Sequence, residues 1–159
     1  MVIGIMSDTH DHQEYIKKAI GLFNEKKVEF VIHAGDYTSP FTLKPFRELN
    51  CAYAGVFGNN DGDRLLLYQR SEGNIHNQPY IFSLYGRQII VIHEHFVVDA
   101  LAASSSFDLV VYGHTHVPDI RKIGKSLIVN PGETGSWLYG KATVATANLD
   151  NMTAEVILL

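Results

Sequence analysis

The chain has 159 residues, 46% of them hydrophobic and 19% charged, and this balance is typical of one globular domain, which we expect to span residues 1–159. A formal net charge of −4 without a Lys/Arg cluster argues against a surface that holds nucleic acid through its phosphates, so stable nucleic-acid binding is not expected. No apolar run reaches the length of a membrane span or a signal-peptide core, which predicts a cytoplasmic protein that does not enter a membrane.

The amino-terminal half alternates predicted strands and helices. The stretch "HQEYIKKAIGLFNEKK" repeats apolar residues at helical spacing, with Asp11 as its expected N-cap. A second helix is expected to begin at Ser39, with Pro40 in its first position. The order strand, helix, strand, helix, strand predicts a mainly parallel sheet. Its strands are expected in three short apolar runs: "VIGIM", "EFVIH" and "CAYAGVF".

The carboxyl-terminal half reads mainly as antiparallel hairpins. Between the first two hairpins, "HFVVDALAASSSF" predicts a short helix and "DLVVYG" another strand. Hairpins need an apolar face to pack on, so the expected fold class is α/β, with two packed β-sheets, one mixed and one antiparallel, flanked by helices. Three hairpins are predicted, with turns at Gly86, at Gly124 and at Asp150–Asn151: "QPYIFSLYGRQIIVIH", "VPDIRKIGKSLIVN" and "KATVATANLDNMTAEVILL".

Polar side chains follow five of the predicted strands. Ligands of α/β sheets bind at the carboxyl ends of the strands, so these side chains are expected to converge. Imidazole and carboxylate groups without a thiolate suit Zn, Mn, Fe or Ni. Seven donors are too many for one tetrahedral ion, whereas two ions about 4 Å apart that share a carboxylate would use all of them, as in two-metal phosphoester hydrolases. The candidates are Asp8, His10, Asp36, Asn59, His93, His114 and His116.

The stretch "GHTH" explains how two histidines so close in sequence could bind different ions. His114 and His116 are expected at alternate positions of an extended segment, with both rings pointing the same way. Gly113 is expected to let the backbone approach the site closely. A purely structural histidine pair is the competing interpretation, and Asn59 could instead be a left-handed turn residue beside Gly58. The presence of the other donors favours ligation in both cases.

Five motifs in order resemble those of the calcineurin-like metallophosphoesterases. The short length and "NPGE" at 130–133 are most similar to the small single-domain bacterial and archaeal phosphodiesterases of that group. The resemblance implies a β-sandwich flanked by helices, with a binuclear metal site at one edge. The motifs are "DTH" at Asp8–His10, "GD" at Gly35–Asp36, "GNND" at Gly58–Asp61, "HEH" at His93–His95 and "GHTH" at Gly113–His116.

The resemblance also implies which residues bind each ion. Asp36 would bridge the two ions. One ion would be held by Asp8, His10 and His116. The other would be held by Asn59, His93 and His114. The implied cofactors are thus two divalent metal ions per chain, drawn from Mn, Ni, Fe or Zn.

The implied activity is that of a metal-dependent phosphodiesterase, in which a hydroxide held by both ions attacks phosphorus in line. The charges of two divalent ions, two aspartates and one hydroxide leave a single positive charge, which matches a singly charged diester. We therefore expect a small phosphodiester as substrate. A phosphomonoesterase or nucleotidase and a non-catalytic scaffold like the retromer subunit of the same fold are the alternatives. The sequence leaves a homo-oligomer possible.

The chain departs from the family pattern at two motif positions. Asn60 stands where the family commonly has a histidine that steadies the transition state or protonates the leaving group, and an amide cannot act as an acid. Either His95 or a water on a metal is expected to substitute for it. Asp61 is expected to orient a ligand histidine. Glu94 replaces a glycine and either adds negative charge to the site or points to solvent. Asn60, His95 and Asp61 are thus the catalytic candidates.

Overall fold

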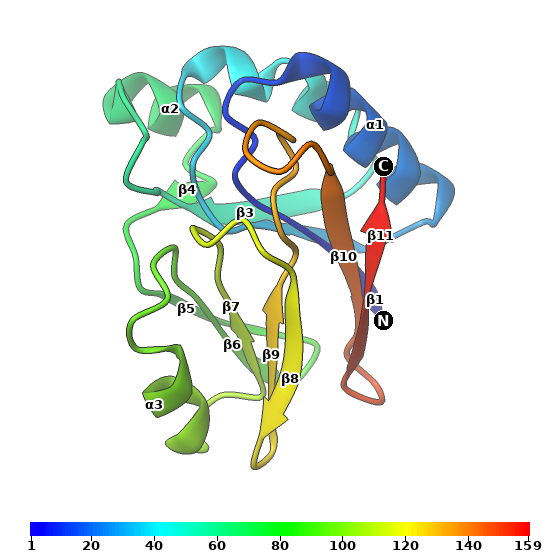
Figure 1. Ribbon diagram of the computed structural model, residues 1–159, viewed down its shortest axis with the longest axis vertical. Coiled ribbons are helices and arrows are strands. Elements are labelled where there is room, and N and C mark those ends of the chain that lie inside the picture. The colour runs from blue at the N-terminus through cyan, green and yellow to red at the C-terminus, as the bar shows by residue number, and fades with distance from the viewer.

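Two β-sheets pack face to face, and helices cover their outer faces (Figure 1). The computed structural model describes all 159 residues. The first sheet has the order β11-β10-β1-β2-β3-β4, and the second has the order β5-β6-β7-β9-β8. The strands of the first sheet are β1 (Val2–Met6), β2 (Phe30–His33), β3 (Ala52–Val56), β4 (Ile75–His76), β10 (Thr143–Asn148) and β11 (Thr153–Leu158). Those of the second are β5 (Tyr80–Leu84), β6 (Arg87–Val91), β7 (Leu109–Val111), β8 (Asp119–Ile123) and β9 (Ser126–Asn130).

Helices lie on both outer faces of this sandwich and complete the predicted fold class. Strands β1 to β4 run parallel, as expected from the alternation of strands and helices. The apolar layer between the sheets is formed by residues from both, and a second layer separates α1, the 3₁₀ turns and α2 from the first sheet. A third layer lies under α3. The helical segments are α1 (Gln13–Glu25), η1 (Pro40–Leu43), η2 (Pro45–Glu48), α2 (Arg64–Arg70) and α3 (Val98–Ala103).

Two expectations about the sheets were wrong. The last hairpin, β10–β11, does not join the second sheet but pairs with β1 at the edge of the first. Its strand β10 is buried on both faces, because Val144 packs under α1 while Ala145 and Ala147 face the other sheet. The second sheet is also mixed rather than antiparallel, because β7 runs parallel to both β6 and β9.

The helix boundaries differ from expectation for local reasons. His12 rather than Asp11 is the N-cap of α1, and the Asp11 carboxylate instead accepts a hydrogen bond from Thr42 Oγ1 (2.6 Å). The helix predicted at Ser39 begins there, but it is two 3₁₀ turns, since Pro45 has no N–H to continue it. The short helix α2 was not predicted. It buries only Leu67, so its apolar periodicity is weak.

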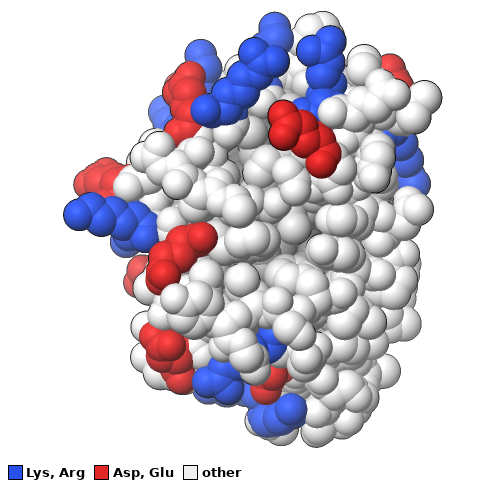
Figure 2. All heavy atoms as spheres, turned by 180° about the vertical axis from the view of Figure 1, so that it is seen from behind, with Lys and Arg blue, Asp and Glu red and all other residues white.

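No helix combines the length and the apolar character that crossing a membrane would require. On the face drawn in Figure 2, basic and acidic side chains are interspersed rather than gathered into a basic stripe. His76 lies in β4 and stacks on Tyr80 with ring centroids 3.7 Å apart.

His33 is buried beneath the ends of β1 and β2. Its Nδ1 accepts a hydrogen bond from the Gly35 N–H (3.1 Å), its Nε2 lies 3.1 Å from Thr9 Oγ1, and its ring stacks on Tyr37. Because Nδ1 is an acceptor, the ring is neutral. Burial, aided by the charge of His93, lowers the pKa of His33 well below its usual range.

We expect His33 to make folding stability depend on pH. Its pKa is lower in the folded state, so the unfolded state gains a proton first as the pH falls below about 6.5. In chelator, the stability advantage of the wild type over His33→Gln should therefore shrink by up to about 1.4 kcal/mol per pH unit in that window. Urea unfolding from pH 8 to 5 measures this difference. A pH-independent difference would contradict a neutral buried ring.

Candidate metal centre

The seven predicted metal ligands follow β1, β2, β3, β6 and β7, at the edge where the carboxyl ends of strands from both sheets meet. Parallel strands in each sheet direct these ends to the same side, so residues more than a hundred positions apart become neighbours. Interatomic contacts connect all seven side chains into one cluster.

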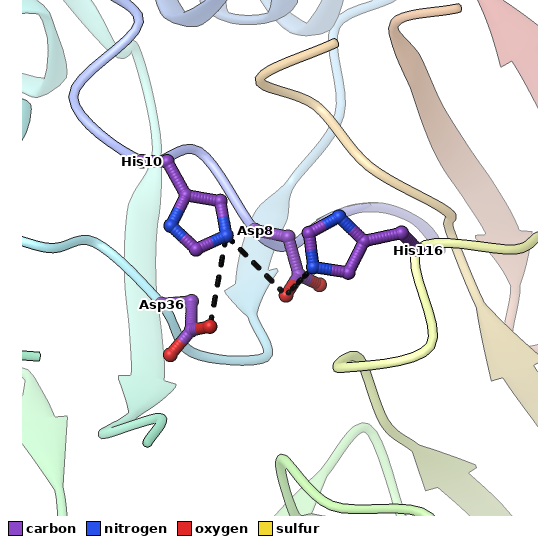
Figure 3. A group of neighbouring side chains, drawn as sticks. All are labelled: Asp8, His10, Asp36 and His116. Carbon is purple, nitrogen blue, oxygen red and sulfur yellow. Dashed lines mark ion pairs between the residues drawn. The ribbon is translucent and has the colours of Figure 1, made fainter. Parts of the chain in front are cut away.

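One half of the cluster is built around two buried carboxylates. Four side chains, Asp8, His10, Asp36 and His116, each offer a ligand atom, and these atoms all lie within 4.8 Å of one another (Figure 3). Asp8 Oδ1 lies 3.3 Å from His116 Nε2 and 3.9 Å from His10 Nε2. Asp36 Oδ2 lies 3.6 Å from His10 Nε2. This half contains the three residues that the family resemblance assigns to one ion, together with the assigned bridge.

The other half of the cluster continues from Asp36. His93 Nε2 lies 3.4 Å from Asp36 Oδ2 and 2.9 Å from Asn59 Oδ1. Asn59 Oδ1 also lies 2.9 Å from His114 Nδ1. Asp36 is therefore the carboxylate that contacts histidines of both halves. Asn59 lies in a turn, but its φ is not positive, so it is not the left-handed turn residue of the alternative interpretation.

Three of the four histidines contact a polar group through the outer ring nitrogen, two of them by a hydrogen bond, whereas His116 Nδ1 makes only an ion-pair contact. His93 Nδ1–H donates to the carbonyl of Ala34 (2.8 Å), which leaves Nε2 directed into the cluster. His10 Nδ1 lies 3.1 Å from Thr38 Oγ1. His116 Nδ1 lies 3.2 Å from a carboxylate oxygen of Glu133. Histidines that bind metals are typically fixed in this way, because the outer contact sets the tautomer and the ring orientation.

Glycines make room for the carboxylates at two motif positions. A Cβ added at Gly113 would lie 2.1 Å from Ser7 Oγ and 2.8 Å from Asp8 Oδ2. The predicted close approach at Gly113 is therefore confirmed. A Cβ at Gly58 would lie 2.1 Å from Asp36 Oδ1, so the glycine of "GNND" serves the same purpose.

The backbone of the cluster is unusually left-handed, which corrects one expectation. His114 (φ 68°) and His116 (φ 59°) do not lie on an extended segment. The turn instead directs His116 towards Asp8 and His114 towards Asn59, so the two rings reach different halves of the cluster. Asp8, His10 and Asp36 also have positive φ, a conformation that costs side chains of this kind of order 1 kcal/mol and is concentrated at functional sites.

The electrostatics of the cluster suit a bound cation. Asp8 is fully buried, its Oδ1 receives no hydrogen bond, and burial raises its pKa. Burial opposes a charge on His93, yet the carboxylates of Asp36 and Asp8 outweigh it and raise the pKa of His93 to about 9. The cluster thus draws positive charge to the place where the ligand atoms converge, and oxygen and imidazole donors of this kind fit divalent metal ions.

The three catalytic candidates have different surroundings. Asn60 is exposed, but its backbone N–H and its side-chain amide donate to the two oxygens of Asp36 (2.8 and 2.7 Å). His95 is exposed at the rim and stacks on His114 with ring centroids 5.7 Å apart. Asp61 accepts the N–H groups of Thr38 and Gly58 (both 2.7 Å), so it contacts loop backbone rather than the histidine expected.

Glu133 of the "NPGE" stretch has a role that its sequence position did not indicate. Its side chain is 1% exposed, and Oε1 lies 3.2 Å from His116 Nδ1. The carboxylate also accepts the backbone N–H groups of Trp137 (2.8 Å) and Leu138 (3.0 Å). It therefore connects the cluster to the loop between β9 and β10. The only sequence signal was the motif itself, because the contact with His116 forms across the fold.

Glu133→Gln is expected to weaken metal binding by about 10- to 100-fold, the usual cost of losing an outer partner of a ligand histidine. The glutamine carbonyl can still accept the loop N–H groups, so the loop should keep its place. Isothermal titration with Mn²⁺ measures the affinity. Glu155→Gln on exposed β11 serves as control and should bind like the wild type. Unchanged affinity in Glu133→Gln would show that the carboxylate supports the loop alone.

A two-sheet sandwich with Asp, His and Asn donors at one edge is the architecture of a metal-dependent hydrolase. The sequence matches the family model of the calcineurin-like phosphoesterase superfamily domain over residues 1–152. The chain therefore belongs to the calcineurin-like phosphoesterase superfamily, and the family resemblance of the motifs is confirmed.

Individual relatives agree with this assignment. A phosphodiesterase of Methanocaldococcus jannaschii is 37% identical, over 100% of this chain and 99% of that protein. A solved archaeal phosphodiesterase superposes with a TM-score of 0.94 at 37% identity, covering both chains completely. Vps29 of Chaetomium thermophilum, at 15% identity and a TM-score of 0.73 over 100% of this chain and 96% of its own, shares the fold.

Proposed function

We propose that this chain hydrolyses a small phosphodiester at the Asp/His/Asn cluster with the help of bound divalent metal ions. It is a hydrolase of the phosphoesterase class. Its relative from Methanocaldococcus jannaschii, which it matches over its full length, is a phosphodiesterase. The observation that carries the proposal is the convergence of seven donors at one edge, with three histidines presenting Nε2 inward.

We propose two ions per chain, one in each half of the cluster. Asp8, His10 and His116 would hold one, and Asn59, His93 and His114 would hold the other. Asp36 would contact both, because its carboxylate already faces histidines of both halves. Bound divalent ions would supply Lewis-acid activation of water and neutralise charge on the phosphoryl oxygens.

The remaining candidates would act around this cluster. Asn60 would be a positioning residue, because its two hydrogen bonds hold both oxygens of Asp36 in place. His95 would donate a proton to the leaving group, since it is exposed at the rim and stacks on His114. Asp61 would hold the loops that carry Thr38 and Gly58.

A diester is proposed over a monoester on grounds of charge. Two divalent ions facing Asp8, Asp36 and one hydroxide carry a single net positive charge, and no Lys or Arg contacts the seven side chains. A dianionic monoester would be left partly uncompensated. Arg64 follows the "GNND" motif closely in sequence. Its guanidinium donates to the carbonyl of Gly58 (2.7 Å) and lies over the ring of Phe57.

Substrate profiling after metal exchange tests the proposal. The protein is stripped with chelator, given Mn²⁺, Ni²⁺, Zn²⁺ or Mg²⁺ singly, and assayed with bis(p-nitrophenyl) phosphate and p-nitrophenyl phosphate. We expect metal-restored cleavage with the diester preferred. Preference for the monoester would identify a phosphomonoesterase instead. Tight binding of two ions without turnover of either ester would favour the scaffold alternative.

Three broader properties are proposed with the function. Residues 1–159 would form one domain, because strands from both halves of the chain share the layer between the sheets. The protein would act on small molecules in the cytoplasm. It would not bind nucleic acid stably, because its net charge is −4. A homo-oligomer could form through the exposed edge strand β11.

A further inference from the structure

The loop between β9 and β10 exposes three large apolar side chains in succession. Trp137 is 61% exposed, Leu138 65% and Tyr139 60%. Trp137 is the only tryptophan of the chain. A single exposed apolar residue is ordinary on a protein surface, so exposure alone does not assign a role. The contacts of Trp137 set it apart from the other two.

Trp137 is held by the residues that build the metal centre. Its indole Nε1–H donates to the carbonyl of His10 (3.2 Å), and its backbone N–H donates to Glu133 (2.8 Å). Two further hydrogen bonds tie the same loop to the end of β1, because Thr134 N–H donates to the Ser7 carbonyl and Gly135 N–H to the Asp8 carbonyl (both 3.0 Å). The indole is therefore fixed at the rim of the cluster.

The orientation of the indole leaves its aromatic surface available. His12 contacts the ring at a tilt of 54° with centroids 4.9 Å apart, and the single polar atom of the ring is already used by His10. What remains open is π surface, with no free hydrogen-bonding group. An aromatic surface of this kind interacts best with another planar ring, by offset stacking or edge contact.

We propose that Trp137 forms a stacking subsite for a planar aromatic ring carried by one ester group of the substrate. This ring is either a nucleobase or an aryl ring. This inference rests on the proposed diesterase function, because it places the aromatic ester beside the phosphate. One ester group lies on the indole while the phosphate occupies the cluster. Because hydrogen bonds already hold the indole and the loop, little ordering cost is added on binding. The substrate class is thus an aromatic phosphodiester rather than a small alkyl one.

Fluorescence of the sole tryptophan tests the subsite without measuring catalysis. The protein loaded with Zn²⁺ is titrated with AMP, phenyl phosphate and methyl phosphate, each a product of diester cleavage. We expect saturable emission changes with the aromatic ligands and none with methyl phosphate. A response to AMP alone identifies a nucleobase, and responses to both aromatic ligands identify a general aryl subsite. No change with any aromatic ligand overturns the proposal.

Kinetics of matched variants give the second readout. Trp137→Ala should raise KM for bis(p-nitrophenyl) phosphate about tenfold with little change in kcat, which is the size of effect that follows from losing one stacking contact. Trp137→Phe should restore most of the affinity. Tyr139→Ala is the control, because Tyr139 is equally exposed on the same loop without a hydrogen bond to the cluster.

The outcomes separate the subsite from the proposed function. An unchanged KM in Trp137→Ala, in an enzyme that still cleaves the diester, overturns the subsite and leaves the phosphodiesterase function intact. A loss of self-association in Trp137→Ala with unchanged KM, measured by light scattering, also overturns it, since the indole would then be an interface between copies. If no diester is cleaved with any metal, the proposed function fails and the fluorescence titration alone decides the subsite.

Discussion

Asp36→Asn is expected to reduce diester hydrolysis by more than about a hundredfold, since even outer partners of metal ligands cost 10- to 100-fold. Asp36 is the carboxylate that faces histidines of both halves of the cluster, at 3.6 Å from His10 and 3.4 Å from His93. An amide in its place removes the negative charge and presents N–H groups where an acceptor is required. Steady-state kinetics with bis(p-nitrophenyl) phosphate measures the loss.

The matched control is Asp63→Asn, the same chemical change a few residues from the cluster. Asp63 caps α2 by accepting the N–H of Leu66 (3.2 Å), and asparagine caps helices nearly as well. Its activity should stay close to that of the wild type. Wild-type activity in Asp36→Asn would exclude the bridging role.

Asp36→Asn also has an expected effect in the metal-free protein. Hydrogen bonds from His93 and Asn60, together with the charge of His93, outweigh burial and lower the pKa of Asp36. Asp36 in turn helps to raise the pKa of His93 to about 9. Without this carboxylate, the pKa of His93 should fall towards or below its usual value of about 6.5. An NMR titration of the imidazole in chelator measures the shift independently of catalysis.

Variants of the "GHTH" histidines are expected to separate two ions. Each should bind about one Mn²⁺ per chain where the wild type binds two, because His116 faces Asp8 in one half and His114 faces Asn59 in the other. Both variants, His116→Ala and His114→Ala, should also lose diester hydrolysis by more than about a hundredfold. Metal analysis after gel filtration gives the stoichiometry. His76→Ala is the control, since His76 stacks on Tyr80 in the fold and contacts none of the seven donors.

Two other stoichiometries would contradict the two-ion assignment. One ion in the wild type and none in either variant would indicate a single mononuclear site. Two ions in both variants would show that neither histidine is a ligand. Two ions in the wild type and one in each variant is the outcome that the geometry predicts.

Particular elements show why much of the fold could be predicted. Short apolar runs ended by polar residues identified β1, β2, β3, β6 and β7, because the buried part of each strand carries apolar side chains. The hairpin turns at Gly86 and Gly124 were predicted equally well. Both glycines have positive φ in the structure. The sheet joined by β10 was not predictable, because local sequence does not say which free edge an additional hairpin will pair with.

The strand ends, the donor residue types and the family could be predicted from the amino-acid sequence, because residue type and order are local properties of the chain. The orientation of those donors could not, because it depends on the folded arrangement. The left-handed turns at His114 and His116 and the contact of Glu133 with His116 arise from packing between distant segments. The same holds for Trp137, whose indole meets the His10 carbonyl across 127 positions of sequence. Contacts of this kind cost chain entropy to close and leave no periodic signal in the sequence.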